Sequence, residues 1–347
     1  MIWQDTGHSW DVTALAIDPH DPDAVLGEVT GLDLSGCSVT EGYYTDTRVS
    51  ADLSTVGEDG WPDLARIRLS LSVPERGWSR DLITGFVTGR GTSEDTGGLL
   101  SSYELDSTLW ALSVDVLDHR VVVGPAGSMV AAASSLLDSC GLAHDLSQAR
   151  DRLAQSAVVW EAGDSPLGVL FDMCGGDSRL DVDGRGLVTM AAYVPPSMRS
   201  PQYELDPTDP RTLVLADPIE EEPGDLDVPG KAVALASVGS GQAVAGSALV
   251  EPSLRSSWER RGYRLAESYH WEGQGSPTAA QLSLYAARML SAAQGATRRW
   301  TLSVAYMDAR AGDVAALRTH DGWHRVLVQT VRTELGDMTQ RLTLKEV

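Results

Sequence analysis

The sequence predicts an α+β chain that is mostly β, with two tube-like β-barrel domains and a small α+β middle domain. Three observations support this prediction. Apolar and polar residues alternate with the two-residue period of half-buried strands near both ends of the chain. Helical periodicity is confined to two stretches near the middle and one at 277–294. Because the helix at 277–294 has no helical neighbour in sequence, we expect domains that are discontinuous in sequence.

Residues 1–113 are predicted to form the first β-barrel domain. Short strands separated by Gly, Pro and Asp turns are typical of a barrel or sandwich. The clearest alternation lies at 65–73, where Ile67, Leu69, Leu71 and Val73 share one face. Arg66, Arg68, Ser70 and Ser72 occupy the other face. The predicted strands are 12–17, 32–39, 47–53, 65–73, 81–88, 99–105 and 109–116.

Residues 114–205 are predicted to form most of the α+β middle domain. One helix begins after Gly127-Ser128, runs to Cys140 and stops at Gly141. A short helical piece is expected at 146–153. A second helix begins at Ser165-Pro166 and ends at Cys174 before two glycines. A hairpin then pairs 178–182 with 187–191 across the turn at 183–186.

Residues 206–347 complete both later domains. Strands are expected at 211–215, 231–238, 300–306, 326–331 and 340–345, an acidic loop at 220–225 and a glycine-rich turn at 239–246. For the helix at 277–294, Ser276 suits the N-cap, Pro277 the first helical position and Gly295 the C-terminal stop. We assign 266–297 to the middle domain, with the helix against the faces carrying Leu136, Leu137 and Leu170. Residues 206–265 and 298–347 then form the second β-barrel domain.

Composition excludes several classes of protein. The chain is 42% hydrophobic, with no apolar run of about 18 residues that would span a membrane. Met1–Asp5 lack the features of a signal peptide, so we expect synthesis and folding in a cytoplasm. The net charge of −22 argues against a nucleic-acid-binding groove and against docking on anionic lipid. An acidic wall that DNA passes without sticking remains compatible with this charge.

No motif in the sequence indicates catalysis, a cofactor or a metal. Gly239-Ser240-Gly241 matches neither a nucleophile elbow nor a phosphate loop. Asp181–Gly186 begins like a calcium loop but lacks the later acids, so a hairpin turn is expected. His320 and His324 are expected at a hairpin tip, not on a zinc-binding helix. Cys37, Cys140 and Cys174 fit no zinc spacing and are expected to be buried. We therefore predict no catalytic, cofactor-binding or metal-binding residue, and a protein that is not an enzyme.

Several stretches carry a resemblance to a known family. The order of elements resembles the baseplate hub, or tail-tip hub, proteins of tailed bacteriophages and related contractile injection systems. The resemblance is one of organisation over nearly the whole chain. The stretches are Leu105–Leu112, Gly127–Leu142, Trp160–Leu170, Leu180–Gly186, Ala311–Val314 and Met338–Val347.

The resemblance implies a structural role in a virion. It implies a homotrimer at the tail tip, assembled in the host cytoplasm, in which two barrels per subunit form a pseudo-sixfold ring continuing the tail tube. DNA and the tape-measure protein would pass through the lumen without specific DNA binding and without membrane insertion. The implied partners are distal tail or tail tube proteins, the tape-measure protein, and tail-fibre or spike proteins. Some hub families continue into a spike, peptidase or lytic domain, whereas this chain ends at Val347, so we expect other proteins to supply such activities.

Two alternatives remain open. A carbohydrate- or receptor-binding module is suggested by ten tryptophans, although Trp110, Trp160, Trp300 and Trp323 fall in different predicted elements. A cell-wall hydrolase using two carboxylates is permitted by the 49 acidic residues but indicated by no spacing among them.

Overall fold

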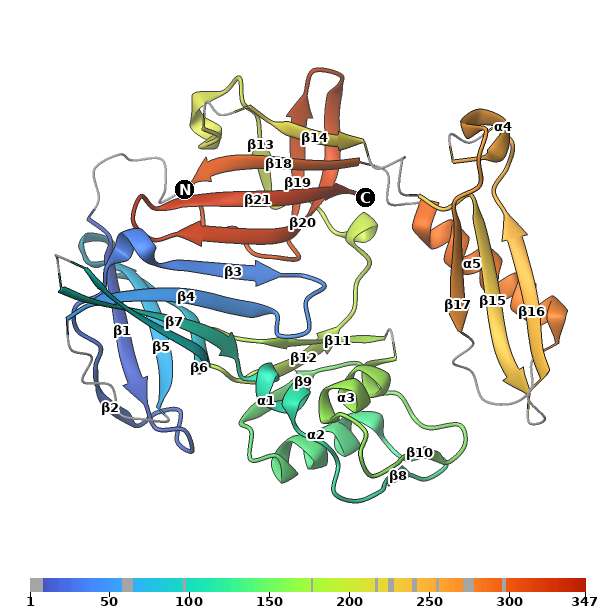
Figure 1. Cartoon of the computed structure of the whole chain (residues 1–347), viewed down its shortest axis with the longest axis horizontal. Coiled ribbons are helices and arrows are strands. Elements are labelled where there is room, and N and C mark those ends of the chain that lie inside the picture. The colour runs from blue at the N-terminus through green and yellow to red at the C-terminus, as the bar shows by residue number, and fades with distance from the viewer. Residues whose placement is uncertain are drawn as a thin grey trace.

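The computed structural model describes residues 9–57, 65–95, 98–175, 177–215, 218–223, 228–238, 242–253, 256–270, 278–294 and 298–347. The chain is mostly β and contains several sheets (Figure 1). Within those residues, no helix is both long and apolar enough to cross a membrane.

Within the described residues, the largest sheet has 13 strands and joins N-terminal to C-terminal strands. Its main path runs β14-β18-β21-β20-β3-β4-β7-β6-β5-β1-β2, and β19 and β13 branch from β20. The N-terminal and C-terminal strands meet where β20 pairs antiparallel with β3, with Thr330 opposite Gly42 and Glu334 opposite Ser38. The strands are β1 Asp11–Ile17, β2 Val25–Glu28, β3 Ser38–Gly42, β4 Val49–Val56, β5 Arg66–Val73, β6 Trp78–Asp95, β7 Gly98–Ser107, β13 Tyr203–Leu205, β14 Glu220–Pro223, β18 Arg298–Ala305, β19 Val314–Thr319, β20 Gly322–Glu334 and β21 Thr339–Glu346.

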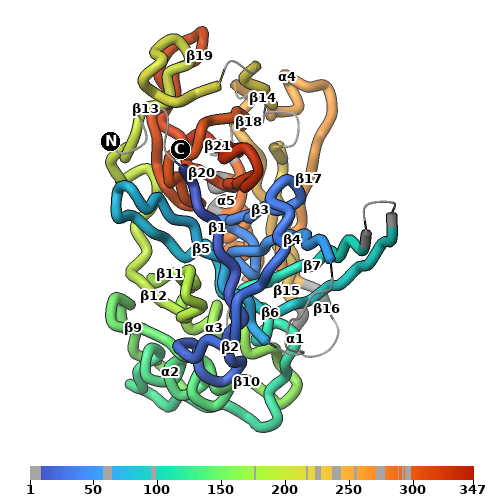
Figure 2. Tube along the Cα trace, turned by 90° about the vertical axis from the view of Figure 1, so that its left-hand side faces the viewer, coloured from blue at the N-terminus to red at the C-terminus, as the bar shows by residue number. Residues whose placement is uncertain are grey.

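The path of this sheet is open, with β14 and β2 at its two ends. The mostly β class is therefore confirmed, whereas the two closed barrels expected from the sequence are not. The strands β6 and β7 are longer than predicted and form a hairpin that extends away from the rest of the sheet (Figure 2).

The alternation predicted for 65–73 is confirmed. Ile67, Leu69 and Leu71 are fully buried in a core shared with β4 and β7. Arg66 lies on the opposite face but is itself buried, because its guanidinium stacks 4.6 Å from the ring centroid of Phe86. A second core, built around Trp300, Leu302 and Leu344, underlies the C-terminal strands.

The middle of the chain folds into a helical unit below the large sheet in Figure 1. The two main predicted helices, α2 and α3, and the hairpin are observed, and Leu137 and Leu170 are fully buried in their shared core. Ser128 caps α2, accepting a hydrogen bond of 2.9 Å from the amide of Ala131. The elements are α1 Leu109–Val114, β8 Val121–Val123, α2 Met129–Ser139, β9 His144–Gln148, β10 Val158–Trp160, α3 Pro166–Cys174, β11 Ser178–Val182 and β12 Val188–Ala192.

Two predictions in this unit are wrong. Residues 109–114 are helix α1 and not a strand, because Leu109 and Leu112, about one helical turn apart, are both buried in the helical core. The short helical piece expected at 146–153 is replaced by β9 and a loop. Parallel pairing with β12, with His144 opposite Val188, determines the strand conformation there.

A separate sheet and helix lie to the right in Figure 1. The sheet order is β16-β15-β17, with α5 packed on one face. Ala232, Ala234, Leu282 and Ala286 are fully buried between the two layers. The elements are β15 Lys231–Val238, β16 Gln242–Leu249, α4 Trp258–Arg261, β17 Ala266–His270 and α5 Ala279–Gln294.

The predicted packing of this helix against Leu136, Leu137 and Leu170 is wrong. Small residues on β15 and β16 form a flat surface that α5 approaches closely. A Cβ added to Gly246 would lie 2.3 Å from the amide nitrogen of Ser283. The helix therefore packs on the sheet formed by the strands that precede it in sequence. The domain boundaries proposed from the sequence stay a prediction.

Three smaller expectations also need correction. The acidic stretch at 220–225 begins with an edge strand, β14. Glu221 forms an ion pair with Arg298 of β18, and Glu220 forms one with Arg341 of β21. Residues 211–215 contain a 3-10 turn, Pro210–Thr212, and one isolated bridge in place of a strand. Most of the glycine-rich stretch at 239–246 belongs to β16, and Gly239–Gly241 lie outside the described residues. The capping residues predicted for the helix at 277–294, Ser276, Pro277 and Gly295, also lie outside the described residues.

Candidate functional site

One face of the large sheet is polar across six neighbouring strands, β18, β21, β20, β3, β4 and β7. Strand alternation turns most of the apolar residues of these strands toward the cores and leaves mainly short hydroxyl and charged side chains on the other side. Cross-strand partners such as Thr301 and Thr343, or Thr330 and Thr343, lie side by side there. We call this surface the polar face. It comprises Arg299, Thr301, Ser303, Thr339, Arg341, Thr343, Lys345, Thr330, Arg332, Glu334, Thr40, Ser50, Asp52, Ser102, Glu104 and Asp106.

Charges on the polar face are arranged in two bands. The cations lie on the C-terminal strands, where Arg299 is opposite Lys345 and Arg332 is opposite Arg341. Burial, and then the neighbouring Arg299, lower the pKa of Lys345. The acids Asp52, Glu104 and Asp106 lie on β4 and β7, where Asp52 is opposite Glu104. The surface is hydrophilic and of mixed sign, and is not uniformly acidic.

Ion pairs connect these bands to their surroundings. Arg332 donates to Glu334 at 2.6 Å, and this hydrogen bond raises the pKa of Arg332. Arg341 donates to Glu220 of β14 at 3.3 Å. At the end of the face toward the β6–β7 hairpin, Val56 and Leu100 form an exposed apolar pair.

A charged cluster joins the N-terminal and C-terminal strands on the opposite side of the sheet. Arg80 of β6 pairs with Glu41 of β3 at 2.8 Å and also with Asp308, which follows β18. The Arg80 and Glu41 side chains are only 7% and 15% exposed. Burial raises the pKa of the Glu41 carboxyl, against the opposing effects of Arg80 and Arg310.

The same junction holds a further carboxylate, that of Asp313, and several aromatic rings. Burial raises the pKa of Asp313, whose carboxylate accepts hydrogen bonds from the backbone of Arg310 at 2.9 Å and from Tyr203 at 3.2 Å. Tyr306 packs edge-on against Trp10, with ring centroids 5.0 Å apart, and lies 6.1 Å from Trp78. The junction therefore combines aromatic packing with buried ion pairs.

The turn at Asp183–Gly186 is a hairpin turn, as predicted, and it docks on the large sheet. Thr84 donates to the carbonyl of Gly184 at 2.8 Å, and Thr108 donates to the carbonyl of Gly186 at 2.9 Å. A Cβ on Gly184 would lie 1.8 Å from the carbonyl oxygen of Asp81. The turn therefore connects the helical unit to β6. The Asp183 carboxylate of the apparent calcium loop accepts hydrogen bonds from the backbone amides of Arg185 and Leu187 and so stabilises the turn.

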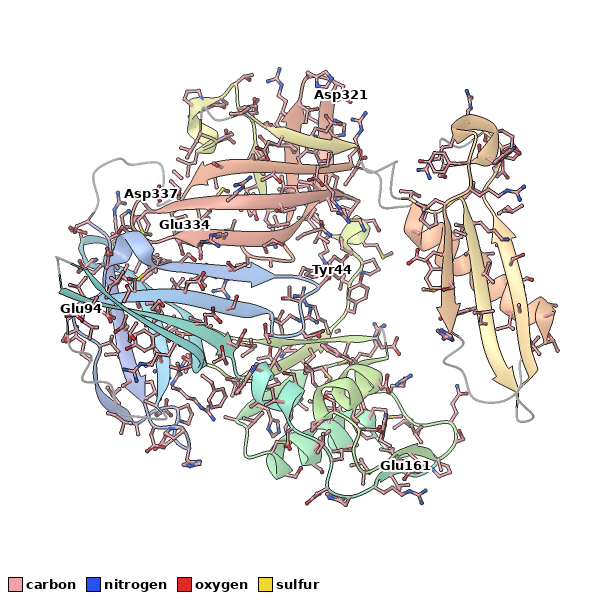
Figure 3. All side chains as sticks on the ribbon, in the orientation of Figure 1. Tyr44, Glu94, Glu161, Asp321, Glu334 and Asp337 are labelled. Carbon is pink, nitrogen blue, oxygen red and sulfur yellow. The ribbon has the colours of Figure 1, made fainter. Side chains whose placement is uncertain are left out.

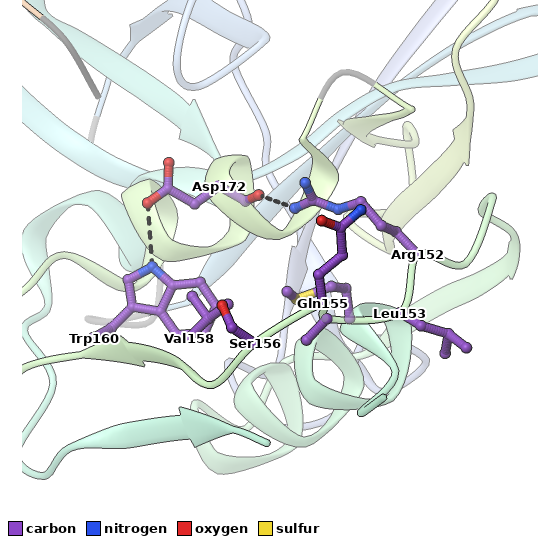
Figure 4. Close-up of a pocket in the computed structure, with 9 residues that line it drawn as sticks. Arg152, Leu153, Gln155, Ser156, Val158, Trp160 and Asp172 are labelled. Atoms are coloured by element: carbon purple, nitrogen blue, oxygen red, sulfur yellow. Dashed lines mark hydrogen bonds between the residues drawn. The ribbon is translucent and has the colours of Figure 1, made fainter. Parts of the chain in front are cut away.

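A pocket of about 680 Å³ lies in the helical unit between α3 and β10 (Figure 4). Asp172 accepts a hydrogen bond of 3.1 Å from the Trp160 indole, and its backbone carbonyl accepts one of 2.9 Å from Arg152. Arg152 thereby satisfies a carbonyl at the C-terminus of α3. Trp160 is 7% exposed, so its ring is not available as a stacking platform for a sugar.

The other residues singled out from the sequence are not gathered at one site. His320 and His324 lie at a hairpin tip, as predicted. His324 lies between Asp321, 2.8 Å away, and Glu346, 3.0 Å away.

Cys37 and Cys174 are buried, and Cys140 is half-buried. Over the described ranges, no group of three or more His, Cys, Asp or Glu residues could hold a metal ion.

Comparison with solved structures identifies the fold. The chain superimposes on a tail protein from Neisseria meningitidis with a TM-score of 0.69 and 13% identity, covering 98% of this chain and 97% of that one. The 43 kDa tail protein of prophage MuSo2 from Shewanella oneidensis gives a TM-score of 0.69 and 10% identity, with 97% and 98% coverage. A component of the Escherichia coli type VI secretion system, described as structurally similar to bacteriophage T4 tail proteins, gives 0.50 and 9%, with 98% and 77% coverage.

The chain has the fold of phage tail proteins and of a type VI secretion component. This confirms at the level of the fold the resemblance seen in the sequence. No family model and no curated protein sequence matches the chain.

The sequence predicts strands of the polar face but not the face itself. In the strands predicted at 300–306 and 340–345, the positions on this face include Thr301, Ser303, Arg341, Thr343 and Lys345. What could not be foreseen is the pairing of β20 with β3, which places the polar positions of both halves of the chain on one surface.

Proposed function

We propose that this chain is a structural, non-catalytic hub subunit of a phage tail tip or baseplate. Three copies would form a ring that continues the tail tube, with the polar face directed toward a passage for DNA and the tape-measure protein. The likeness to tail proteins over nearly the whole chain supports a tail role. Neighbouring tail tube, tape-measure, and fibre or spike proteins are the proposed partners, and the virion tail is the proposed location.

The single observation that carries this proposal is the polar face. A passage for a moving polymer requires a wall with few apolar side chains that would adhere to it. Across six strands, the face presents mainly Thr, Ser and charged residues, and its exposed apolar pair, Val56 and Leu100, lies at the end toward the β6–β7 hairpin. A sheet face six strands wide can be exposed to water only when its side chains are mainly polar.

The charge of the polar face refines the proposed passage. The net charge of −22 suggested a wall that repels phosphates throughout. On the polar face, however, the acids of β4 and β7 lie beside a band of cations on β18, β21 and β20. We therefore propose a wall that carries a cationic and an acidic band side by side, so that a polyanion meets both repulsive and weakly attractive zones.

Site-specific crosslinking tests the orientation of the polar face. A photo-crosslinker attached at Thr343→Cys, on strand β21 of the polar face, should react with DNA or tape-measure protein in assembled tails. Glu161→Cys serves as the control, since Glu161 lies at the far end of the helical unit (Figure 3). Equal crosslinking from both positions, or none from Thr343→Cys, would contradict the proposed orientation.

Imaging tests the ring itself. The full chain, alone or in assembled tails, is expected to appear as a ring of three copies with a central hole. A chain that stays monomeric inside the assembled particle would overturn the hub proposal.

A further inference from the structure

The charge of the chain is divided unevenly between its parts. The segment 228–294, which contains β15, β16, β17, α4 and α5, carries six basic and four acidic side chains, a net charge of +2. Since the whole chain carries −22, the remainder carries −24. One unit of the fold is thus weakly cationic, and the rest is strongly acidic.

Aromatic and arginine side chains gather at one end of this unit, around α4. Trp258 is 51% exposed and Tyr263 is 47% exposed. The guanidinium of Arg264 lies 5.5 Å from the ring centroid of Trp258, and that of Arg261 lies 5.8 Å from the ring of Tyr263. Arg260 is exposed beside them. We call residues 256–264 the α4 tip; it is at the top of the right-hand unit in Figure 1.

The α4 tip is held in place by its own hydrogen bonds. Ser257 donates to the carbonyl of Pro252 at 2.9 Å, and the amide of Gly262 donates to the carbonyl of Trp258 at 2.8 Å. Arg261 donates to the carbonyl of Val228 at 2.7 Å, which ties the tip to the start of β15. A surface ordered before binding loses little conformational entropy when a partner docks.

We propose that the α4 tip docks on the acidic surface of a neighbouring copy of this chain. The inference rests on the proposed ring, which brings copies into contact. Trp, Tyr and Arg are the residues that most often dominate the binding energy of protein interfaces. The remainder of each copy, at −24, supplies the complementary charge. The same −24 disfavours a free polyanion as the occupant, because its approach would be repelled by the rest of the chain.

Sedimentation of the full-length chain tests the docking. Trp258→Ala and Arg264→Glu should each weaken self-association at least about 30-fold, the loss expected for a hot-spot residue. The effect of Arg264→Glu should decrease as salt is raised. Trp323→Ala removes a tryptophan that is 52% exposed on the β19–β20 hairpin, and Arg150→Glu reverses an exposed arginine in the helical unit. Both control variants should associate like the wild type.

The possible outcomes separate the two proposals. A ring that forms with unchanged affinity in Trp258→Ala and Arg264→Glu would overturn the docking and leave the hub proposal intact. A wild-type chain that is monomeric at every concentration and in assembled tails would overturn both. If Arg264→Glu abolishes binding to a duplex DNA fragment but leaves self-association unchanged, the α4 tip binds nucleic acid and the inference is wrong. Near-ultraviolet circular dichroism confirms that each variant is folded.

Discussion

At the scale of single residues, close approaches determine which substitutions the fold accepts. Gly184 places its backbone where a side chain would meet the carbonyl oxygen of Asp81, and Gly246 does the same against α5. In both places a glycine lets two elements pack more closely than a Cβ would allow. The sequence marks these positions only as glycines, because the partner surface comes from elsewhere in the chain.

The Gly184→Ala substitution should loosen the contact between the helical unit and β6. The added Cβ would lie 1.8 Å from backbone oxygen, so the turn must move and lose the hydrogen bond from Thr84. We expect a loss of about 1–3 kcal/mol in the free energy of unfolding, measured by urea denaturation. Gly124→Ala is the matched control, since a Cβ there meets no atom within 4 Å. An equal effect of the two substitutions would show that the turn does not dock as described.

At the scale of elements, α5 is stabilised by one face only. Leu282 and Ala286 are fully buried against β15 and β16, whereas Leu284 is 73% exposed on the same helix. The two leucines thus have the same chemistry and neighbouring positions but opposite environments. Substituting each leucine in turn therefore tests which face of α5 packs on the sheet.

Leu282→Ala should destabilise the α5 unit by about 2–5 kcal/mol, because it leaves a cavity between the helix and the sheet. Leu284→Ala should change stability by less than about 0.5 kcal/mol. Hydrogen exchange of the β15 and β16 amides provides the measurement. Leu137→Ala, in the core of the helical unit, should leave those amides unaffected. If Leu137→Ala accelerated their exchange as much as Leu282→Ala does, α5 would belong with α2 and α3 after all.

The local sequence pattern predicts individual strands and helices better than it predicts which elements pack against each other. The strand at 66–73 and helices α2 and α3 are predictable because burial on one face imposes a period that the sequence displays. The strand predicted over 109–116 is wrong because Leu109, Leu112 and the residues between them fit either period over so short a stretch. The packing of α5 is not predictable, because the small residues of β15 do not indicate which helix packs against them.

At the scale of the whole molecule, the pairing of β20 with β3 creates both the polar face and the charged junction. Main-chain hydrogen bonds between β20 and β3 join the two halves of the sheet. Arg80 adds one ion pair to Glu41 in the N-terminal half and one to Asp308 in the C-terminal half. Removing one partner of a buried ion pair leaves the other uncompensated. The junction is therefore where pH is expected to act on the stability of the whole chain.

The Glu41→Gln substitution should alter the pH dependence of stability in a definite direction. Burial raises the pKa of Glu41 in the folded chain above its ordinary value of 4.5. The stability linked to this group is fully present below pH 4.5 and is lost as the pH rises through the raised pKa. Asp313 contributes with the same sign. Glu41→Gln keeps an acceptor for Arg80 but removes the titration, so its stability should decline less steeply than that of the wild type as the pH rises from about 4.5.

Urea midpoints measured from about pH 4.5 to neutrality provide this comparison, since the difference between the two proteins isolates Glu41 from the other acids. Glu94→Gln, on the exposed β6–β7 hairpin, is the control and should follow the wild-type profile (Figure 3). Parallel profiles for the wild type and Glu41→Gln would show that the Glu41 carboxyl is not desolvated at the junction. The ion pair with Arg80 would then be a surface contact, and the two halves of the sheet would be joined by main-chain pairing and aromatic packing alone.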